Sequence, residues 1–190
     1  RELFKERHAL ISLTNEHVQQ VLHMKTCIDA MEEAYRDLNE RRAGYRPRID
    51  FYVPQEPHYY RWGTMEGASR SLGVFAIRMK SDMLAWEKQD GFMVEDKYCI
   101  ERGRYCGLIF LLSTRNGEPL ALMNDGYLQH MRVGACAGLG TKYLARRNSK
   151  VLAMIGSGGM ARTYAEAIRQ VRPIQVMRVF SPTRANRETF

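Results

Sequence analysis

The sequence lacks the features that mark several specialised protein classes. Its four cysteines are scattered over 190 residues without a C-x-x-C pair, which argues against a zinc module or a disulfide scaffold and favours a reducing cytoplasm. The longest apolar run, residues 107–112, has the length of a strand and falls far short of the roughly 20 residues of a membrane-spanning helix. Charges throughout residues 1–30 exclude a secretory signal segment. With 45% apolar and 26% charged residues, the composition is that of a soluble globular protein.

The chain carries a basic excess but no concentrated basic motif. Lys and Arg outnumber Asp and Glu by 29 to 21, giving a net charge of +8. The basic residues are spread along the chain, and their densest cluster, residues 41–48, lies where a helix is expected to end. Cations are favourable at a helix C-terminus because they complement the helix dipole. The sequence therefore predicts no nucleic-acid partner.

The first 150 residues predict a mixture of helices and strands. Thr14 is a candidate N-cap for a first helix, and apolar spacings of three and four over residues 28–38 predict a second helix that stops near Gly44. Residues 45–60 should be extended. Strict alternation over residues 72–80 predicts a strand that Lys80 ends, with Arg78 and Lys80 on the same face. Two such neighbouring cations are unfavourable unless an anion lies between them.

A hairpin and a glycine-rich helix follow. Residues 108–113 and 119–123 flank an Asn-Gly pair, which is a strong signal for a hairpin turn. Residues 128–146 predict a helix, in which Gly134, Gly138 and Gly140 each cost stability. We expect these glycines to allow close packing of a neighbouring backbone. Asn148-Ser149 breaks the pattern and marks a domain boundary.

The segment after this boundary carries the clearest chemical signal. A short apolar strand, residues 151–155, runs into the G-x-G-x-x-A sequence between Gly156 and Ala161. A helix, Pro173 and a second strand over residues 175–180 follow. This order within about 30 residues is the context that a dinucleotide-binding fingerprint requires.

Each residue type in this turn suits a bound pyrophosphate. Gly156 permits the tight turn, Gly158 lets the backbone approach the phosphates, and Ala161 allows the helix to pack closely on the strand. The helix N-terminus offers free N–H groups to the phosphates. The candidate cofactor-binding residues of the turn are Gly156, Ser157, Gly158, Gly159, Met160 and Ala161. The alternative interpretation is an ordinary glycine-rich turn between a strand and a helix.

The end of the second strand favours NADP(H) over NAD(H). An Asp or Glu there would bind the ribose 2′-hydroxyl, but the sequence has no acid at this point. Ser181 and Thr183 can donate hydrogen bonds to a 2′-phosphate, and Arg184 can pair with it. The alternative is that Arg184 is a solvated surface residue and that NAD binds without the usual acid. Because the sequence stops after one βαβ unit, we also expect an incomplete dinucleotide domain.

In the order and spacing of its motifs, the sequence resembles the ornithine cyclodeaminase/mu-crystallin family. The resemblance runs from the helix ending in Arg-Ala-Gly and the following Pro47-Arg48, through Trp62-Gly-Thr-Met65-Glu-Gly and Lys80, to the Asn-Gly hairpin. It continues with Met131-Arg132-Val-Gly-Ala135, Lys142-Tyr-Leu-Ala-Arg and the glycine turn. The resemblance thus covers nearly the whole chain.

This resemblance implies an α/β protein with two domains, usually a homodimer. Residues 1–130 would form an α+β substrate-binding and dimerisation domain, residues 131–148 a bridging helix, and residues 149–190 the first βαβ unit of a Rossmann domain. Members of the family exchange a hydride between NAD(P) and a carbon that bears an amine or imine next to a carboxylate. The implied reactions are those of ketimine reductases, amino-acid dehydrogenases and cyclodeaminases, of which the cyclodeaminases are lyases. The resemblance implies no bound metal and no membrane partner. A non-catalytic protein of the mu-crystallin type that binds NADPH and a small ligand is the alternative.

Three cations match the carboxylate-binding positions of the family. These are Arg48, Lys80 and Arg132, and Lys80 is also the candidate catalytic residue of this chain. Chemistry supports the match, because the substrate carboxylate must be clamped for its α-carbon to meet the cofactor, and Arg is suited to bidentate carboxylate binding. The alternatives are a surface arginine at 48, a solvated lysine at 80, and at 132 an arginine that reaches out of its helix to solvent.

Overall fold

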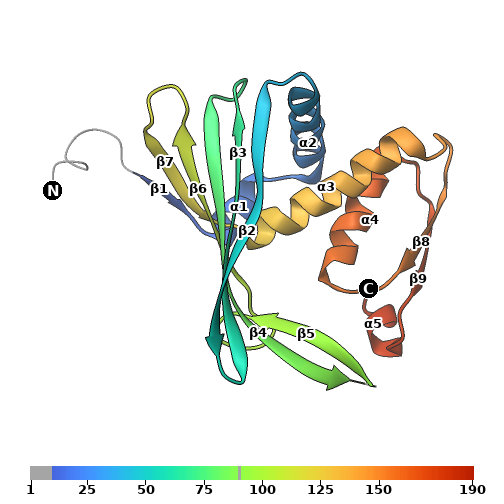
Figure 1. The fold of residues 1–190 in the computed structure, drawn as a ribbon. Helices are drawn as coiled ribbons and strands as arrows, with labels where there is room; N and C mark the ends of the chain where they lie inside the picture. Colours follow the sequence, from blue (N-terminus) through green and yellow to red (C-terminus); the bar gives the residue numbers. More distant parts are fainter. Residues whose placement is uncertain (1–9, 90) are drawn as a thin grey trace. The chain divides into compact units, whose positions relative to one another are not determined.

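The computed structural model describes residues 10–89 and 91–190 and confirms a mixed α/β fold (Figure 1). The chain divides into two compact units. Unit 1 comprises the chain up to His17 together with Asp37–Gly126, and unit 2 comprises Val18–Arg36 and Tyr127–Phe190. None of the helices in the described ranges is long and apolar enough to cross a membrane. Each unit is described below by itself.

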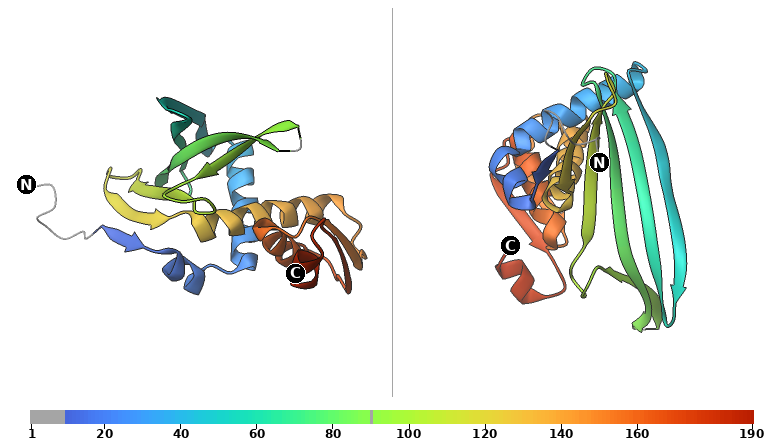
Figure 2. Two further views of the ribbon diagram at one scale, coloured as in Figure 1. Left: turned by 90° about the horizontal axis from the view of Figure 1, so that it is seen from below. Right: turned by 90° about the vertical axis from the view of Figure 1, so that its left-hand side faces the viewer.

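Unit 1 is built on a seven-stranded sheet. Its strands are β1 (Ile11–Leu13), β2 (Ala43–Gln55), β3 (His58–Ser69), β4 (Val74–Gln89), β5 (Phe92–Tyr98), β6 (Cys106–Ser113) and β7 (Pro119–Asn124). The order across the sheet is β1-β7-β6-β4-β3-β2, and only the β1–β7 pair is parallel. The long strands β2, β3, β4 and β6 lie side by side in Figure 2.

The long strand β4 changes partner halfway along its length. Residues from Val74 to Ser81 pair with β6, and residues from Met83 to Gln89 pair with β5. The second half of β4 and β5 form the two-stranded arm of Figure 1. The prediction that Lys80 ends a strand is therefore wrong: β5 takes over from β6 as the hydrogen-bonding partner, so the strand continues, and Lys80 lies near its middle.

Local sequence signals account for most of the boundaries in unit 1. The predicted hairpin is confirmed as β6 and β7, and Gly117 takes the positive φ of 79° that its turn requires. The helix predicted to stop near Gly44 ends earlier, at Asn39. Arg41 turns the chain with a φ of 57°, so Gly44 already belongs to β2.

Most of the helices belong to unit 2. The helices of the chain are α1 (Asn15–Val21), α2 (Met24–Asn39), α3 (Gly126–Leu144), α4 (Gly159–Val171) and α5 (Arg184–Glu188). The parallel strands β8 (Val151–Ile155) and β9 (Val176–Phe180) flank α4 in the chain, as the sequence predicted. Thr14 caps α1 as expected, because its Oγ1 accepts a hydrogen bond of 3.4 Å from the backbone N–H of His17. The core joins α2, α3 and α4 through Met24, Cys27, Ile28, Met131, Ala135 and Ala167.

Two of the three α3 glycines for which close packing was predicted, Gly134 and Gly138, pack closely against α4. A Cβ atom at Gly134 would lie 2.6 Å from the backbone oxygen of Thr163, and one at Gly138 would lie 2.9 Å from Cβ of Ala167. The expectation of close backbone packing is confirmed at these positions. It is wrong at Gly140, which is exposed and has no atom within 4 Å of a built Cβ.

This difference gives a matched pair of stability variants. Gly134→Ala should lower the free energy of unfolding by about 1–3 kcal/mol, because the methyl group forces α3 away from the α4 backbone. Gly140→Ala should raise it by up to about 1 kcal/mol, because alanine is the better helix former and meets no obstacle. Urea denaturation of both variants tests this. Equal effects in the two variants would contradict the packing role of Gly134.

Candidate functional site

The turn between β8 and α4 has the backbone geometry of a phosphate-binding loop. Gly156 adopts a φ of +105°, a conformation that side chains rarely allow. Its N–H donates a 2.7 Å hydrogen bond to the backbone oxygen of Phe180 at the end of β9. This bond brings the turn next to the start of the segment 181–184, so the structure joins two parts of the predicted cofactor site.

The turn is open where a pyrophosphate would approach. Gly158 is the N-cap of α4, with φ and ψ of −72° and 176°. Because glycine has no side chain, the N-terminus of this helix has no side-chain cap. No atom lies within 4 Å of a Cβ built at Gly156 or Gly158. Gly159 is exposed, Ser157 and Met160 are half-buried, and Ala161 is buried where the helix packs. The residues present therefore fit a dinucleotide, whose phosphates would meet free helix N–H groups.

The residues after β9 are arranged less favourably than the sequence suggested. Ser181 is buried, and Thr183 is the N-cap residue of α5. The Arg184 side chain is 82% exposed and pairs with Glu188 at 2.6 Å. Arg187, which the sequence analysis did not single out, donates to the backbone oxygen of Ser181. Arg184 is thus a surface arginine, held only by an exposed ion pair that is worth little in water.

In unit 1, Lys80 lies between two glycines in the sheet. Gly63 on β3 and Gly107 on β6 are its direct cross-strand neighbours. A Cβ at Gly63 would lie 2.2 Å from Oδ1 of Asp50, and a Cβ at Gly107 would lie 2.0 Å from Oδ1 of Asp125. The two glycines therefore make room for a carboxylate on each side of Lys80.

Three arginine–aspartate pairs surround this lysine. Arg48 donates to Asp50 at 2.7 Å, Arg61 to Asp82 at 2.6 Å, and Arg78 to Asp125 at 2.5 Å. Each arginine thus has its own carboxylate. Lys80 is left with a weaker contact, 3.8 Å from its Nζ to Oδ2 of Asp82, which is its only ion pair among the described residues. Glu95 also lies 3.9 Å from Nη1 of Arg61. Lys80 is therefore the cation of this cluster with the loosest pairing.

The Lys80 side chain is largely buried, and burial affects both its ionisation and its affinity for an anion. The Lys80 side chain is 12% exposed. Removal from water lowers the pKa of Lys80 below its ordinary value, and Arg78 and Lys97 lower it further, while Asp82 and Asp125 oppose the shift. A half-dehydrated ammonium of this kind binds a carboxylate more strongly than a fully solvated lysine does.

The structure brings two of the three predicted carboxylate binders together. Nε of Arg48 lies 3.5 Å from the Cβ position of Gly63, the direct neighbour of Lys80, so both cations lie on the same face of unit 1. Arg132 lies on α3 in unit 2, where it forms no ion pair within the described ranges. It contributes a positive field at Cys27 and Tyr35.

The carboxylates of this cluster escaped the sequence analysis. The alternation did place Arg78 and Lys80 on one face and indicated that an anion should separate them, and Asp125 and Asp82 supply that charge from the protein itself. Asp125 is 47 residues from Arg78 in the chain, and Arg61 is 21 residues from Asp82. Only the strand register pairs residues so distant. The one local signal was Asp82 itself, an acid two residues beyond Lys80 on the same face.

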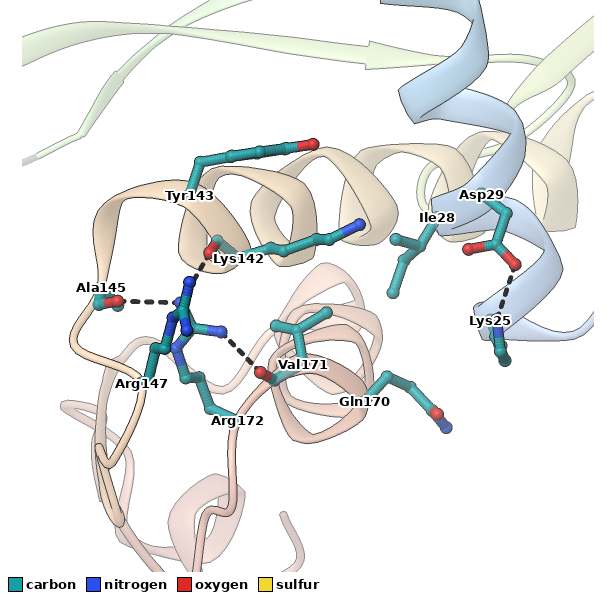
Figure 3. Close-up of a pocket in the computed structure, with 10 residues that line it drawn as sticks. All are labelled: Lys25, Ile28, Asp29, Lys142, Tyr143, Ala145, Arg147, Gln170, Val171 and Arg172. Atoms are coloured by element: carbon teal, nitrogen blue, oxygen red, sulfur yellow. Dashed lines mark hydrogen bonds and ion pairs between the residues drawn. The ribbon is translucent and has the colours of Figure 1, made fainter.

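A separate hollow of about 660 Å³ lies at the C-terminal ends of α3 and α4 (Figure 3). Its floor includes Arg172, whose guanidinium donates to the backbone oxygens of Lys142, Ala145 and Arg146 at 2.6–3.0 Å. Arg172 thereby satisfies the open carbonyl groups at the end of α3. The role of Arg172 is structural, and no residue predicted for the site lines this hollow.

Comparison with known proteins gives a consistent result. A sequence model of the ornithine cyclodeaminase/mu-crystallin family matches residues 9–190. A Δ1-pyrroline-2-carboxylate reductase of Bacillus cereus is 46% identical over 77 residues, which are 40% of this chain and 24% of that protein. The alanine dehydrogenase of Archaeoglobus fulgidus is 29% identical over 168 residues, which are 88% of this chain and 47% of the relative.

Solved structures show the same likeness. The Δ1-pyrroline-2-carboxylate reductase of Thermococcus litoralis, in complex with NADH and L-proline, superposes with a TM-score of 0.76 at 26% identity. The match covers 95% of this chain and 52% of that one. An archaeal alanine dehydrogenase dimer with bound NAD gives a TM-score of 0.75, also at 26% identity. The chain therefore spans about half the length, or less, of the relatives it matches.

Proposed function

The chain belongs to the ornithine cyclodeaminase/mu-crystallin family, and we propose that the protein is an NAD(P)-dependent enzyme acting on a small amino or imino acid. The reaction moves a hydride to or from the carbon that bears the amine or imine, next to a carboxylate. The observation that carries the proposal is the open turn at Gly156–Ala161. At Gly156 the turn has a backbone conformation that favours glycine, and the N-terminus of α4 beside it has no side-chain cap. Relatives named as a pyrroline-2-carboxylate reductase and an alanine dehydrogenase support it.

The cation cluster of unit 1 supports the choice of substrate. A carboxylate ligand can bind Lys80, the most loosely paired cation of the cluster, and Arg48 lies on the same face. Arg48 is held by Asp50 in a partly exposed pair, so a substrate carboxylate can compete for it. We assign carboxylate binding to Arg48 and Lys80, and the same role for Arg132 remains a prediction of the family resemblance. Lys80, whose pKa is lowered by burial, is also the candidate catalytic residue.

The nicotinamide supplies and accepts the hydride when it is bound. The protein's task on this side is to hold the dinucleotide through the backbone of the turn, from Gly156 to Ala161. For the domains, we propose a substrate and dimerisation domain over residues 1–130, a bridging helix over 131–148 and the start of a Rossmann domain over 149–190. A homodimer and a cytoplasmic location remain predictions of the family resemblance and the cysteine pattern.

We also propose that the protein prefers NADP(H), although the two structural relatives carry NADH and NAD. No acid follows β9 directly, and the exposed Arg184 can exchange Glu188 for a 2′-phosphate at little cost. NADPH should therefore bind at least about tenfold more tightly than NADH, and Arg184→Met should remove most of this difference.

Titration of both cofactors by protein fluorescence measures this preference. Arg169→Met is a matched control, because Arg169 is an exposed arginine in the last turn of α4, at the opposite end of that helix from the glycine turn. The control should leave both affinities unchanged. Equal affinities for NADPH and NADH in the parent protein would refute the preference for NADP(H) but not the proposed dinucleotide site.

A substrate panel tests the activity. Ornithine, lysine, alanine with its keto acid and ammonia, and cyclic imines with five- and six-membered rings should each be assayed with both cofactors. We expect turnover with at least one of them. Tight NADPH binding without turnover of any member would favour the alternative, a ligand-binding protein of the mu-crystallin type.

A further inference from the structure

Asp82 is a buried carboxylate with an unmet hydrogen-bonding capacity. It lies two residues beyond Lys80 on β4, so both side chains face the same side of the sheet. Its side chain is 0% exposed, and its Oδ2 lies 2.6 Å from Nη2 of Arg61 and 3.8 Å from Nζ of Lys80. Its Oδ1 is buried and has no hydrogen-bond partner in the described part of the chain. The Lys80 ammonium is a donor close enough to meet this need with a small movement.

We propose that Asp82 is a positioning residue, which Arg61 fixes in place and which in turn holds the Lys80 ammonium charged and oriented. The two cations beside Asp82, Arg61 and Lys80, differ in whether they can lose their charge. Arg61 is itself only 8% exposed and stays charged at every accessible pH, so it anchors the carboxylate permanently. Lys80 can lose its proton, and whether it does depends on the charges around it.

The charges around Lys80 single out Asp82. The charged groups around Lys80 come from five parts of unit 1: Arg78 and Asp82 on β4, Arg61 on β3, Arg48 and Asp50 on β2, Glu95 and Lys97 on β5, and Asp125 after β7. Each of the three aspartates is engaged by its own arginine at 2.5–2.7 Å, but among the described residues only Asp82 also forms an ion pair with Lys80. Asp82 is the strongest influence that keeps the pKa of Lys80 up against burial, with Asp125 a weaker one. Without Asp82, burial and the remaining cations should drive the proton off.

A purely structural ion pair would behave differently. A buried pair can often be replaced by apolar residues of similar size without loss of stability. A variant that removes only the charge of Asp82 and keeps the fold therefore separates the two roles. If Asp82 positions Lys80, that variant must change the titration of Lys80.

Competitive labelling with acetic anhydride reads this titration directly. Only the neutral amine reacts, so the labelling rate of Lys80 as a function of pH, followed by mass spectrometry of its peptide, reports its pKa. In Asp82→Asn we expect the midpoint to move to lower pH, so that Lys80 reacts about tenfold faster than in the parent protein at a pH below the parent midpoint. Asp96→Asn is the matched control, because Asp96 lies on β5 opposite Ala85, on the other face of the sheet.

Every outcome decides the proposal. A shifted midpoint in Asp82→Asn with an unchanged midpoint in Asp96→Asn supports it, and an unchanged midpoint in a folded Asp82→Asn protein overturns it. If Asp82→Asn fails to fold, Asp82→Ser, which leaves Arg61 in place, replaces it, with the same two readings. Circular dichroism checks the fold of each variant.

The consequence for catalysis rests on the proposed function, whereas the labelling result does not. If Lys80 binds a substrate carboxylate as an ammonium, the alkaline limb of kcat/KM should move to lower pH in Asp82→Asn, in step with the labelling midpoint. A shifted midpoint in a protein that turns over no amino or imino acid would leave the role of Asp82 intact and reject the proposed activity. The two failures can thus be told apart.

Discussion

Lys80→Met should lower kcat/KM for the amino or imino acid substrate by about 100-fold while leaving the Kd of the dinucleotide unchanged. Lys80 is the most loosely paired cation of its cluster and is largely removed from water, so it is the group that a substrate carboxylate can bind. Losing one partner of a buried charged hydrogen bond costs about 3 kcal/mol, which corresponds to roughly two powers of ten in rate. Steady-state kinetics together with cofactor titration measure the two quantities separately.

Lys88→Met is the control for this variant. Lys88 lies on the same strand and the same face, but it is exposed, on the arm that β4 forms with β5. It should keep the kinetics of the parent protein. A loss of similar size in both variants, or an unchanged kcat/KM in Lys80→Met, would remove Lys80 from the substrate site.

Gly158→Val should abolish dinucleotide binding without unfolding the protein. The backbone at Gly158 has a φ of −72°, which any residue adopts, and a Cβ there meets no atom within 4 Å. The Cβ atom itself therefore clashes with nothing in the protein, and the valine side chain occupies the space that a pyrophosphate needs at the N-terminus of α4. We expect the Kd of NADPH to rise by at least about 100-fold, as measured by calorimetry, with a melting temperature lowered by no more than about 2–4 °C, because valine is a poorer N-cap than glycine.

Gly44→Val provides the comparison. Gly44 also has open space around its Cβ position, and it lies in β2 of unit 1. This variant should bind the cofactor as the parent does. Gly156→Val would be less informative, because a φ of +105° strains any side chain and confuses folding with binding. If Gly158→Val binds NADPH normally, the turn is an ordinary glycine-rich connection.

The parts that the sequence predicted well are those determined by neighbours in the chain. The turn at Gly156, the strands on either side of α4 and the Asn-Gly hairpin all depend on a few consecutive residues. The alternation of Phe75, Ile77 and Met79 with Arg78 and Lys80 likewise gave the two faces of β4 correctly. Local backbone preferences and side-chain periodicity are sufficient for such features.

The parts that the sequence could not give depend on register between distant strands. Nothing in the sequence indicates the packing role of Gly63 and Gly107, and only their pairing with Lys80 shows that they make room for Asp50 and Asp125. The end of β4 was misplaced for a similar reason. A strand lasts as long as it has a partner, and the replacement of β6 by β5 beyond Ser81 cannot be read from the residues of β4 alone.

The backbone geometry of the turn at Gly156–Ala161 was predicted from the sequence, whereas the side-chain arrangement after β9 was not. The sequence grouped Ser181, Thr183 and Arg184 as candidate donors to a 2′-phosphate. The structure buries Ser181, places Thr183 at the start of α5 and pairs Arg184 with Glu188. Glu188 lies one helical turn beyond Arg184 and reaches it because α5 forms there. A sequence motif does not show side-chain pairing of this kind.

Transfer of deuterium tests the central claim most directly. The protein should be incubated with NADPH carrying deuterium at C4 of the nicotinamide and with a cyclic imino acid, and the product analysed by mass spectrometry. A hydride-transfer enzyme of the proposed kind gives an amino acid that is one mass unit heavier, with the label on the carbon next to the carboxylate. Binding of NADPH without label in any amino acid product, across both ring sizes and both faces of the nicotinamide, would contradict the account.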